Sequence, residues 1–326
     1  MSNQNVIKPN DQKGLSLVEL MVAMVIGLII LAAVSTLFAN SNKNYKTTDS
    51  LARLQENART AVQFLSNDIR RAGYIGCMGS IDNVQVNLNG GNINGILLAP
   101  FTGTEGGGTA SDTLTLQYLD LTSSVAVTAS MQSEGESLTV AAGHPFKQYD
   151  IVAVTDCDKT DVFQITNNAA SGTTIAHASG SLPAPYQGNS TGNLSKAYST
   201  NAFIMKFSQL KYEIRNGASG RPSLWRGGEE LVEGIENMQV LYGYRTDPTI
   251  RAPNVYATVN NVPSWKSVVS VRVGLLANSI ADTTTGEIGH DVDTKTYNVN
   301  GTTIDPPDDR RTRRTFLTTV ETRNIQ

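Results

Sequence analysis

The sequence Lys13-Gly14-Leu15-Ser16-Leu17-Val18-Glu19 opens an apolar run that continues to Phe38. From Leu15 to Phe38, Glu19 is the only charged residue. A helix over residues 15–38 would be about 36 Å long, which is enough to cross the ~30 Å hydrocarbon core of a bilayer. A carboxylate inside such a segment costs roughly 2.5–3.5 kcal/mol, so it usually has a partner and a function. The run therefore predicts a membrane-spanning helix with one functional acid near its start.

Two other interpretations of the run follow from its residues. Lys8 and Lys13 before an apolar stretch also describe a secretory signal peptide, with a cleavage site at Ala33-Val34-Ser35. The run is longer than the about 7–15 apolar residues of such a peptide, and it contains Glu19. A plain membrane anchor is the second alternative. Basic residues lie on both sides of the run, so charge does not set its orientation.

The combination of Gly14, the apolar Leu15 and Glu19 at the mouth of a spanning segment resembles the processing site of type IV pilins and pseudopilins. The resemblance implies that a prepilin peptidase removes residues 1–14 by cleaving after Gly14, and that it N-methylates Leu15. It also implies that Glu19 pairs with the free amine of a neighbouring subunit. Such pairing sets the register between subunits, because a buried carboxylate is stabilised only where a cation meets it.

The helix is predicted to continue beyond the span to about Arg71 and to end at Gly73. Its second half carries an apolar stripe with steps of three or four residues: Leu51, Leu54, Ala58, Val62, Leu65 and Ile69. Polar residues are expected on its other faces: Arg53, Glu56, Asn57, Arg59 and Asp68. Because the stripe needs a cover, this half is expected to pack on the sheet of a following domain.

Composition favours an exported, β-rich domain after the helix. The net charge is −3, from 26 basic and 29 acidic residues, so no basic surplus points to nucleic acid. Aromatic residues make up only 6% of the chain, and glycine, asparagine, serine and threonine are abundant. This pattern is more typical of a β-rich domain with many turns than of a helical enzyme.

The chain has two cysteines, Cys77 and Cys157. An even pair beyond a membrane span predicts one disulfide in an oxidising compartment. The bond would close a loop of 80 residues (157 minus 77), which a chain-entropy estimate values at roughly 4 kcal/mol. Two buried free thiols are the alternative.

Longer segments of the chain resemble the PilW family of minor pilins almost from end to end. They are Arg71-Ala72-Gly73-Tyr74-Ile75-Gly76-Cys77, Val154-Thr155-Asp156-Cys157, Asp161-Val162-Phe163-Gln164-Ile165-Thr166, Leu231-Val232-Glu233-Gly234-Ile235-Glu236-Asn237-Met238-Gln239-Val240-Leu241-Tyr242-Gly243-Tyr244, Val268-Val269-Ser270-Val271-Arg272-Val273-Gly274-Leu275-Leu276 and Arg314-Thr315-Phe316-Leu317-Thr318-Thr319-Val320. The resemblance implies an α+β, pilin-like lollipop, with a helix over residues 15–71 packed on a β-rich head over residues 72–326. Residues 78–200 are the least family-like part.

Strand patterns support the β-rich head. Residues 113–119 alternate between apolar and polar, which indicates a half-buried strand, and a separate short strand is predicted at 125–127. Two further strands are predicted at 203–207 and 210–215. The strongest strands by β-branched content are 235–244 and 268–277, and the chain is predicted to end on a strand at 315–322. The order of these strands does not follow from the sequence.

No set of residues predicts catalysis, a cofactor or a metal site. His144, His177 and His290 have no second ligand at metal spacing. Asp156, Asp158 and Asp161 lack the remaining features of a calcium loop and are expected to be solvated turn residues. The basic residues before the last strand are expected either to blunt a sheet edge or to contact an acidic partner: Arg310, Arg311, Arg313 and Arg314.

Taken with the resemblance, the sequence predicts a non-enzymatic minor pilin for type IV pilus assembly. Its implied partners are prepilin peptidase, other minor pilins and the major pilin, which it meets through the helix, together with a tip adhesin. The implied locations are the inner membrane with the head in the periplasm, and then the pilus at or near its tip. The alternatives are a tip pseudopilin of a type II secretion system and a membrane-anchored or secreted adhesin-like binding module.

Overall fold

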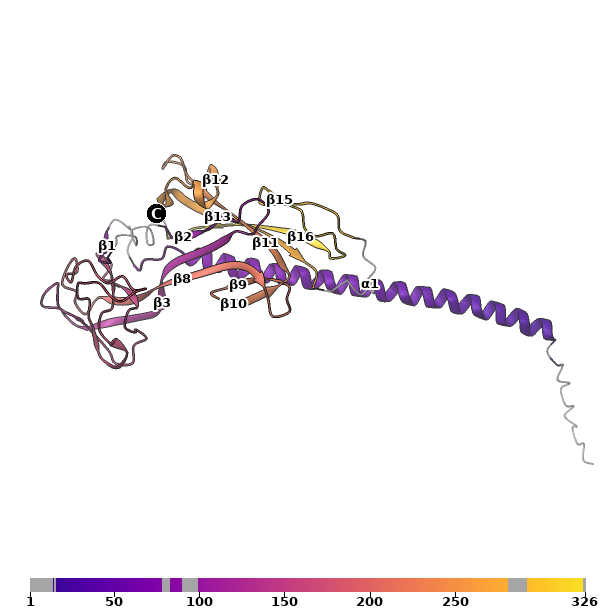
Figure 1. The fold of residues 1–326 in the computed structure, drawn as a ribbon, viewed down its shortest axis with the longest axis horizontal. Helices are drawn as coiled ribbons and strands as arrows, with labels where there is room; N and C mark the ends of the chain where they lie inside the picture. The colour runs from indigo at the N-terminus through magenta and orange to yellow at the C-terminus, as the bar shows by residue number, and fades with distance from the viewer. Residues whose placement is uncertain (1–13, 15, 78–82, 90–98, 281–291, 325–326) are drawn as a thin grey trace, which may run out of the picture.

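The computed structural model describes residues 14, 16–77, 83–89, 99–280 and 292–324. One long helix, α1 (Leu17–Arg71), projects from a head made of strands (Figure 1). At 1.5 Å per residue the helix is about 80 Å long. No proline or mid-helix cap interrupts it, and Ala72 ends it with an extended backbone conformation (φ −56°, ψ 142°). The predicted α+β architecture, a long N-terminal helix followed by a β-rich head, is confirmed.

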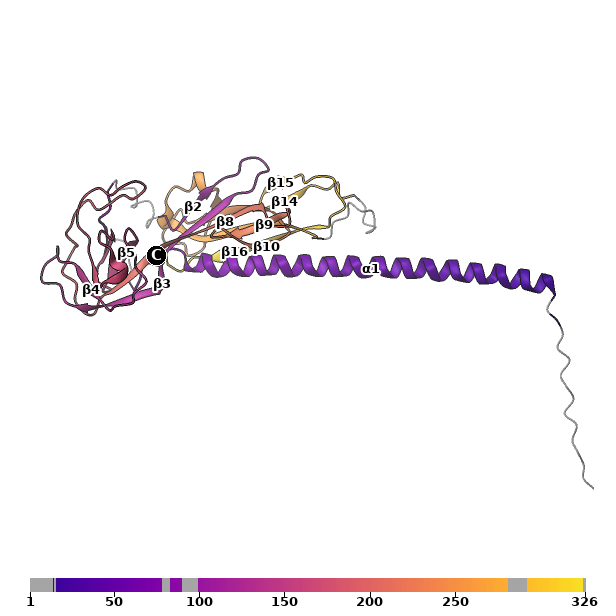
Figure 2. The same cartoon turned by 60° about the horizontal axis from the view of Figure 1, so that its bottom comes forward.

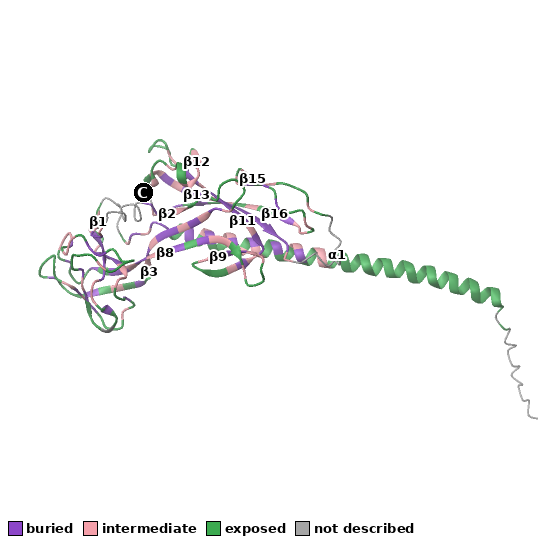
Figure 3. Cartoon of the chain, viewed as in Figure 1, coloured by how far each residue is buried: buried purple, intermediate pink, exposed green. Residues whose placement is uncertain are grey.

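The two halves of α1 differ in what they contact. Every described residue from 16 to 45 is exposed, whereas seven residues of the second half are buried (Figure 3). The buried residues are Ser50, Leu54, Ala58, Ala61, Leu65, Asp68 and Ile69. The predicted apolar stripe is therefore the packed face, although Leu51 and Val62 are only half-buried and Ala61 belongs to it.

Two long strands, β3 (Thr113–Ala129) and β8 (Phe203–Asn216), form the backbone of the head. They pair antiparallel along most of their length, so each unites two strands that the sequence predicted separately. The register shifts between Asp120 and Val125, and the hydroxyl of Ser123 accepts a hydrogen bond from the Lys206 N–H (2.8 Å). This side chain replaces a backbone partner at the bulge, which allows the pair to bend without ending.

The bulge separates two lobes that share β3 and β8. The distal lobe lies beyond the C-terminal end of α1 (Figure 2) and contains β1, β4, β5, β6 and β7, in the order β1-β6-β5-β8-β3-β4-β7. These strands are β1 (Val84–Val86), β4 (Leu138–Val140), β5 (Ile151–Thr155), β6 (Thr160–Gln164) and β7 (Thr174–Ile175), with a short 3-10 helix η2 (Ala169–Ser171) between the last two. Its core includes Phe146, Phe163 and Tyr198 and contains no residue of α1.

The helix-proximal lobe consists of the remaining parts of β3 and β8 with β2, β9 and β10, and of a second sheet in the order β12-β11-β13-β16. Its elements are β2 (Phe101–Thr104), β9 (Pro222–Arg226), β10 (Glu229–Glu233), β11 (Ile235–Tyr244), β12 (Val255–Ala257), η3 (Val259–Asn261), η4 (Trp265–Ser267), β13 (Val268–Asn278) and β16 (Arg313–Glu321). A hairpin of β14 (Tyr297–Val299) and β15 (Thr302–Ile304) lies against the sheet through a small apolar cluster with Leu276.

The core of the helix-proximal lobe includes α1 as a structural element. Leu54, Leu65 and Ile69 are buried with Tyr212 of β8, Val240 of β11 and residues of β13. Full burial of one such side chain contributes about 1.5–3 kcal/mol. The second half of α1 is therefore part of this lobe, while the first half has no packing within the described chain.

Candidate assembly site on the N-terminal helix

The exposed half of α1 is strongly apolar. Its exposed side chains include Leu17, Ile26, Leu31 and Phe38, with exposed fractions of 52–77%. Within the described residues, α1 is the one helix long and apolar enough to cross a membrane. Because apolar surface of this extent is unstable in water, it favours a bilayer or an apolar surface of another chain around this half.

The start of α1 is closed by a capping box. The Glu19 N–H donates to the Ser16 hydroxyl (3.2 Å), and the Ser16 N–H donates to the Glu19 carboxylate Oε2 (2.9 Å). Glu19 is exposed, and within the described residues its other oxygen, Oε1, has no partner. Gly14 is also exposed, while Leu15 lies outside the described residues. Glu19 can therefore cap its own helix and still accept a cation from outside.

A buried polar cluster fixes the other end of α1 to the head. Asp68 accepts hydrogen bonds from the hydroxyl of Tyr212 on β8 and from Nε of Arg226 on β9 (2.7 Å). Burial and the bond to Asp68 raise the pKa of Tyr212, and the bond to Asp68 raises the pKa of Arg226. Asp68 was predicted on a polar face of the helix, and this prediction was wrong because Asp68 continues the buried series of Ala61 and Leu65 at a step of three.

The disulfide joins the end of α1 to the distal lobe. Cys77 follows the helix exit, and Cys157 lies in the turn between β5 and β6. Their sulfurs are bonded and their Cα atoms are 5.0 Å apart, as the disulfide prediction required. Nearby, the Gly73 N–H donates to the Gln117 carbonyl of β3 (2.8 Å), so the exit segment is held by both covalent and hydrogen bonds.

The basic residues before the last strand do not form the expected surface run. The side chain of Arg313 is fully buried, and it pairs with three carboxylates: Glu236 (2.7 Å), Asp309 (2.8 Å) and Asp293 (3.3 Å). Burial raises the pKa of Asp309, but hydrogen bonds from Arg313 and Arg311 outweigh it, so the net pKa is lowered. Arg313 therefore anchors β16 rather than offering charge to a partner.

The acids beside Cys157 differ in environment. Asp161 is fully buried and accepts hydrogen bonds from Ser195, Tyr198 and Asn87, so its prediction as a solvated turn residue was wrong. Asp156 pairs with Lys196 (2.6 Å), and Asp158 is exposed. No group of three or more His, Cys, Asp or Glu residues among those described is arranged to hold a metal ion.

The histidines have structural surroundings. His177 is buried against Phe163, and its Nε2 lies 2.9 Å from the Glu136 carbonyl oxygen. His144 lies beside Phe146. His290 lies outside the described residues. These contacts favour a packing role for the two described rings.

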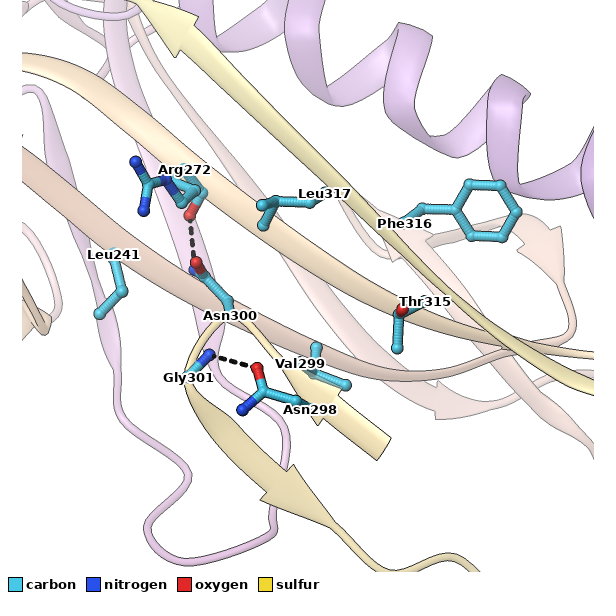
Figure 4. Close-up of a pocket in the computed structure, with 9 residues that line it drawn as sticks. All are labelled: Leu241, Arg272, Asn298, Val299, Asn300, Gly301, Thr315, Phe316 and Leu317. Carbon is cyan, nitrogen blue, oxygen red and sulfur yellow. Dashed lines mark hydrogen bonds between the residues drawn. The ribbon is translucent and has the colours of Figure 1, made fainter. Parts of the chain in front are cut away.

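A cavity of about 410 Å³ lies between β16 and the β14–β15 hairpin, on the face of the second sheet that points away from α1 (Figure 4). Leu241, Arg272 and Leu317 line it together with the hairpin turn. Figure 4 shows Phe316 pointing toward the helix, on the opposite side of β16 from the hairpin. The lining contains neither a nucleophile paired with a base nor a pair of carboxylates.

Two families match this chain, and each matches a different part of the structure. Residues 211–324 match the family Type IV Pilus-assembly protein W, and residues 9–35 match the Prokaryotic N-terminal methylation motif. Together these two matches support a PilW-like minor pilin of type IV pilus assembly. The first match covers the second sheet and its neighbours in the helix-proximal lobe, and the second covers the exposed start of α1. Similarity to this class indicates a structural protein that interacts with other pilins and associates with a membrane.

Among solved structures, the type IV-like pilin TTHA1219 from Thermus thermophilus is similar to this chain. The sequences are 12% identical, the TM-score is 0.35, and the similarity covers 84% of this chain and 97% of that one. A comparison with curated proteins gives no match.

The two partners of Asp68 in the buried polar cluster were not predicted from the sequence. Tyr212 and Arg226 lie more than 140 residues from Asp68 along the chain, so nothing local connects them. The one available signal was the spacing of Asp68 from Ala61 and Leu65, which places a carboxylate on the apolar face of the helix.

Proposed function

We propose that this minor pilin is made as a precursor whose residues 1–14 are removed by prepilin peptidase, and that Leu15 becomes its N-methylated first residue. The span over residues 15–38 then holds it in the inner membrane, with residues 72–326 forming a periplasmic head. On assembly the span leaves the lipid and joins a bundle formed by the helices of other pilins. The match of residues 9–35 to the methylation motif supports this course.

The observation that carries the proposal is the unpacked first half of α1. Every described residue from 16 to 45 is exposed, and the side chains from 20 to 38 are almost all apolar. An apolar helix of about 20 residues suits a bilayer core, and the same surface suits packing against equivalent helices. One segment can therefore serve both the membrane-bound precursor and the assembled fibre.

The capping box gives Glu19 two roles in this scheme. One carboxylate oxygen accepts the Ser16 N–H and stabilises the start of its own helix. The other oxygen is available for the amine that cleavage creates on the Leu15 of a neighbouring subunit. In a bundle of apolar helices an unpaired carboxylate is costly, so subunits pack favourably only in the register where this amine meets Glu19.

We further propose that the protein acts in a small priming complex with other minor pilins at or near the pilus tip, where the complex presents an adhesin. The distal lobe supports a terminal position, because it extends the head beyond the end of α1 (Figure 2). Immunogold labelling of sheared pili tests the position: label at fibre ends is expected, and dense label along the shaft would contradict it.

The test of processing is the intact mass and N-terminal sequence of the protein recovered from cell membranes. We expect a chain that begins at N-methyl-Leu15. A chain that begins after Ser35 would instead identify a secreted protein and would leave Glu19 without a function.

The test of register is Glu19→Ala, with Glu56→Gln as the matched control on an exposed position of the same helix. Glu19→Ala should be cleaved but fail to enter fibres, whereas Glu56→Gln should be cleaved and incorporated normally. Incorporation of both variants at the wild-type level would refute the role of Glu19.

A further inference from the structure

The last strand of the chain, β16, is an open edge of the second sheet. It pairs with β13 on one side, and among the described residues no strand pairs with its other side. It is a nine-residue strand, about 30 Å long, and five of its residues are exposed. An exposed strand of this length is a template for pairing with another chain.

The register shows which backbone groups face the open edge. The Thr322 N–H donates to the Val269 carbonyl and the Ser279 N–H donates to the Thr312 carbonyl, so even-numbered residues bond to β13. In an antiparallel ladder the alternate residues then point their N–H and C=O groups outward. The outward N–H and C=O groups of Thr315, Leu317 and Thr319 have no backbone partner within the described chain.

The side chains of the same residues form a surface on the face away from α1. Leu317 lies at the centre of this surface and is 63% exposed. It borders the cavity that Leu241 and Arg272 also line (Figure 4). The Arg272 guanidinium lies 3.7 Å from the centre of the Tyr256 ring, and its Nε donates to the Thr319 hydroxyl (3.4 Å). The surface thus combines an exposed apolar side chain with a positive charge that no described carboxylate pairs with.

Antiparallel self-pairing of β16 conflicts with a shared membrane. Asn324, just after β16, donates to the Arg70 and Ala72 carbonyls at the end of α1, and Asn57 of α1 donates to the Glu233 carbonyl near the other end of β16. The strand and the helix therefore run in the same direction, as Figure 1 shows. Antiparallel pairing of two copies through β16 would point their spans in opposite directions, so two copies anchored in one membrane cannot form it.

We propose that β16 is the docking edge for an extended strand from the head of a different pilin of the same fibre. This inference rests on the proposed function, because the partner is another pilin. The edge lies beside the second half of α1, so a strand added there lies in line with the first half, through which the proposed function joins pilins. The chemistry specifies an apolar side chain opposite Leu317 and an acidic one two positions away, opposite Thr319 and within reach of Arg272.

The decisive substitution is Leu317→Pro in the full chain, produced in piliated cells. Proline removes the outward N–H of residue 317 but none of the bonds to β13, so the subunit should fold normally. Thr319→Pro removes the next outward N–H, that of residue 319. Leu317→Thr is the control, because it keeps the N–H groups of both residues 317 and 319. Copurified pilin should fall about tenfold in each proline variant and only about threefold in Leu317→Thr. A normal Cys77–Cys157 bond and normal cleavage after Gly14 verify folding and insertion.

The partner is identified by placing the photoreactive residue p-benzoylphenylalanine at position 317, with position 121 on the exposed Leu121 as the matched control. We expect a covalent adduct with another pilin from position 317 only. If the wild-type chain copurifies pilins but the proline variants do so equally, the docking edge is refuted and the proposed function stands. If the wild-type chain copurifies no pilin, the proposed function itself fails. An adduct with a second copy of this chain would also overturn the inference.

Discussion

The helix-proximal and distal lobes are built from the same two long strands, but they complete their cores differently. The proximal core requires Leu54, Ala58 and Leu65 from α1, whereas the distal core draws all its described residues from the head. The proximal lobe also contains nearly all of the segment that matches the pilus-assembly family, residues 211–324. The part of the head that resembles the family is thus the part whose core α1 completes.

Each lobe has a network around a fully buried charged side chain, and these two networks differ as well. The proximal lobe buries Arg313 among three carboxylates, and the distal lobe buries Asp161 among neutral donors. Only the distal lobe is tied to the helix exit by a disulfide. The comparison indicates that the proximal lobe is stabilised through α1 and the distal lobe through Cys77–Cys157.

Both lobes can be followed separately in the purified full chain in detergent. The two tryptophans, Trp225 and Trp265, lie in the helix-proximal lobe, so their fluorescence reports its unfolding. Amide hydrogen exchange of β5 and β6 reports the distal lobe. Agreement of the two measurements in every variant would show that the lobes unfold as one unit.

The largest expected effect is that of Arg313→Met. It leaves Glu236, Asp293 and Asp309 close together without their cation, so the tryptophan transition should lose about 4 kcal/mol of unfolding free energy. The neighbouring Arg314→Met is the control, because Arg314 is exposed, and it should change stability by less than about 0.5 kcal/mol. Equal losses in both variants would contradict the anchoring role of Arg313.

Removal of the disulfide by replacing both Cys77 and Cys157 with serine should act mainly on the distal lobe. The loss is expected at about 3 kcal/mol, because the unfolded chain is freed from a closed loop of 80 residues. Exchange of β5 and β6 should accelerate while the tryptophan transition moves less. Reductant should have the same effect on the wild-type chain and none on the double variant.

Asp161→Asn should destabilise the distal lobe by about 2 kcal/mol. The neutral amide keeps the shape but weakens the charge-assisted bonds from Ser195 and Tyr198. Asp158→Asn is the control, because the side chain of Asp158 is 76% exposed. A shift of the tryptophan transition as large as the change in exchange would show that the network also supports the proximal lobe.

The smallest expected effect is on the pH dependence of the proximal lobe. The pKa of Asp309 is lower in the folded chain than its usual value of about 3.9, so Asp309 stabilises the lobe above that pH. This stabilisation is lost as the pH falls through the lowered folded pKa. Asp309→Asn should reduce the loss of unfolding free energy between about pH 5 and 3 by less than about 1 kcal/mol. Asp308→Asn, at an exposed neighbouring position, is the control.

The local parts of the fold were predictable from the sequence. The long helix and its packed stripe followed from periodicity, because a core face repeats at the period of its element. The boundaries of β11 followed from its content of β-branched residues. The continuity of β3 and β8 was not predictable. Polar residues such as Thr122 and Ser123 have the composition of a turn, and only pairing with β8 reveals that Ser123 bridges a bulge.

For the candidate assembly site, the sequence alone determined the apolar span, the acid at Glu19 and the motif around Gly14, and it predicted that the two cysteines pair. The span, the acid and the motif depend only on neighbouring residues, and the pairing follows because the chain has only two cysteines. Only the tertiary structure decided which charges are buried and which edge is open. Asp68, Asp161 and Arg313 have ordinary neighbours in sequence, and their partners lie on other elements. The open edge of β16 likewise depends on the strand order, because a residue pattern does not show which side of a strand lacks a partner.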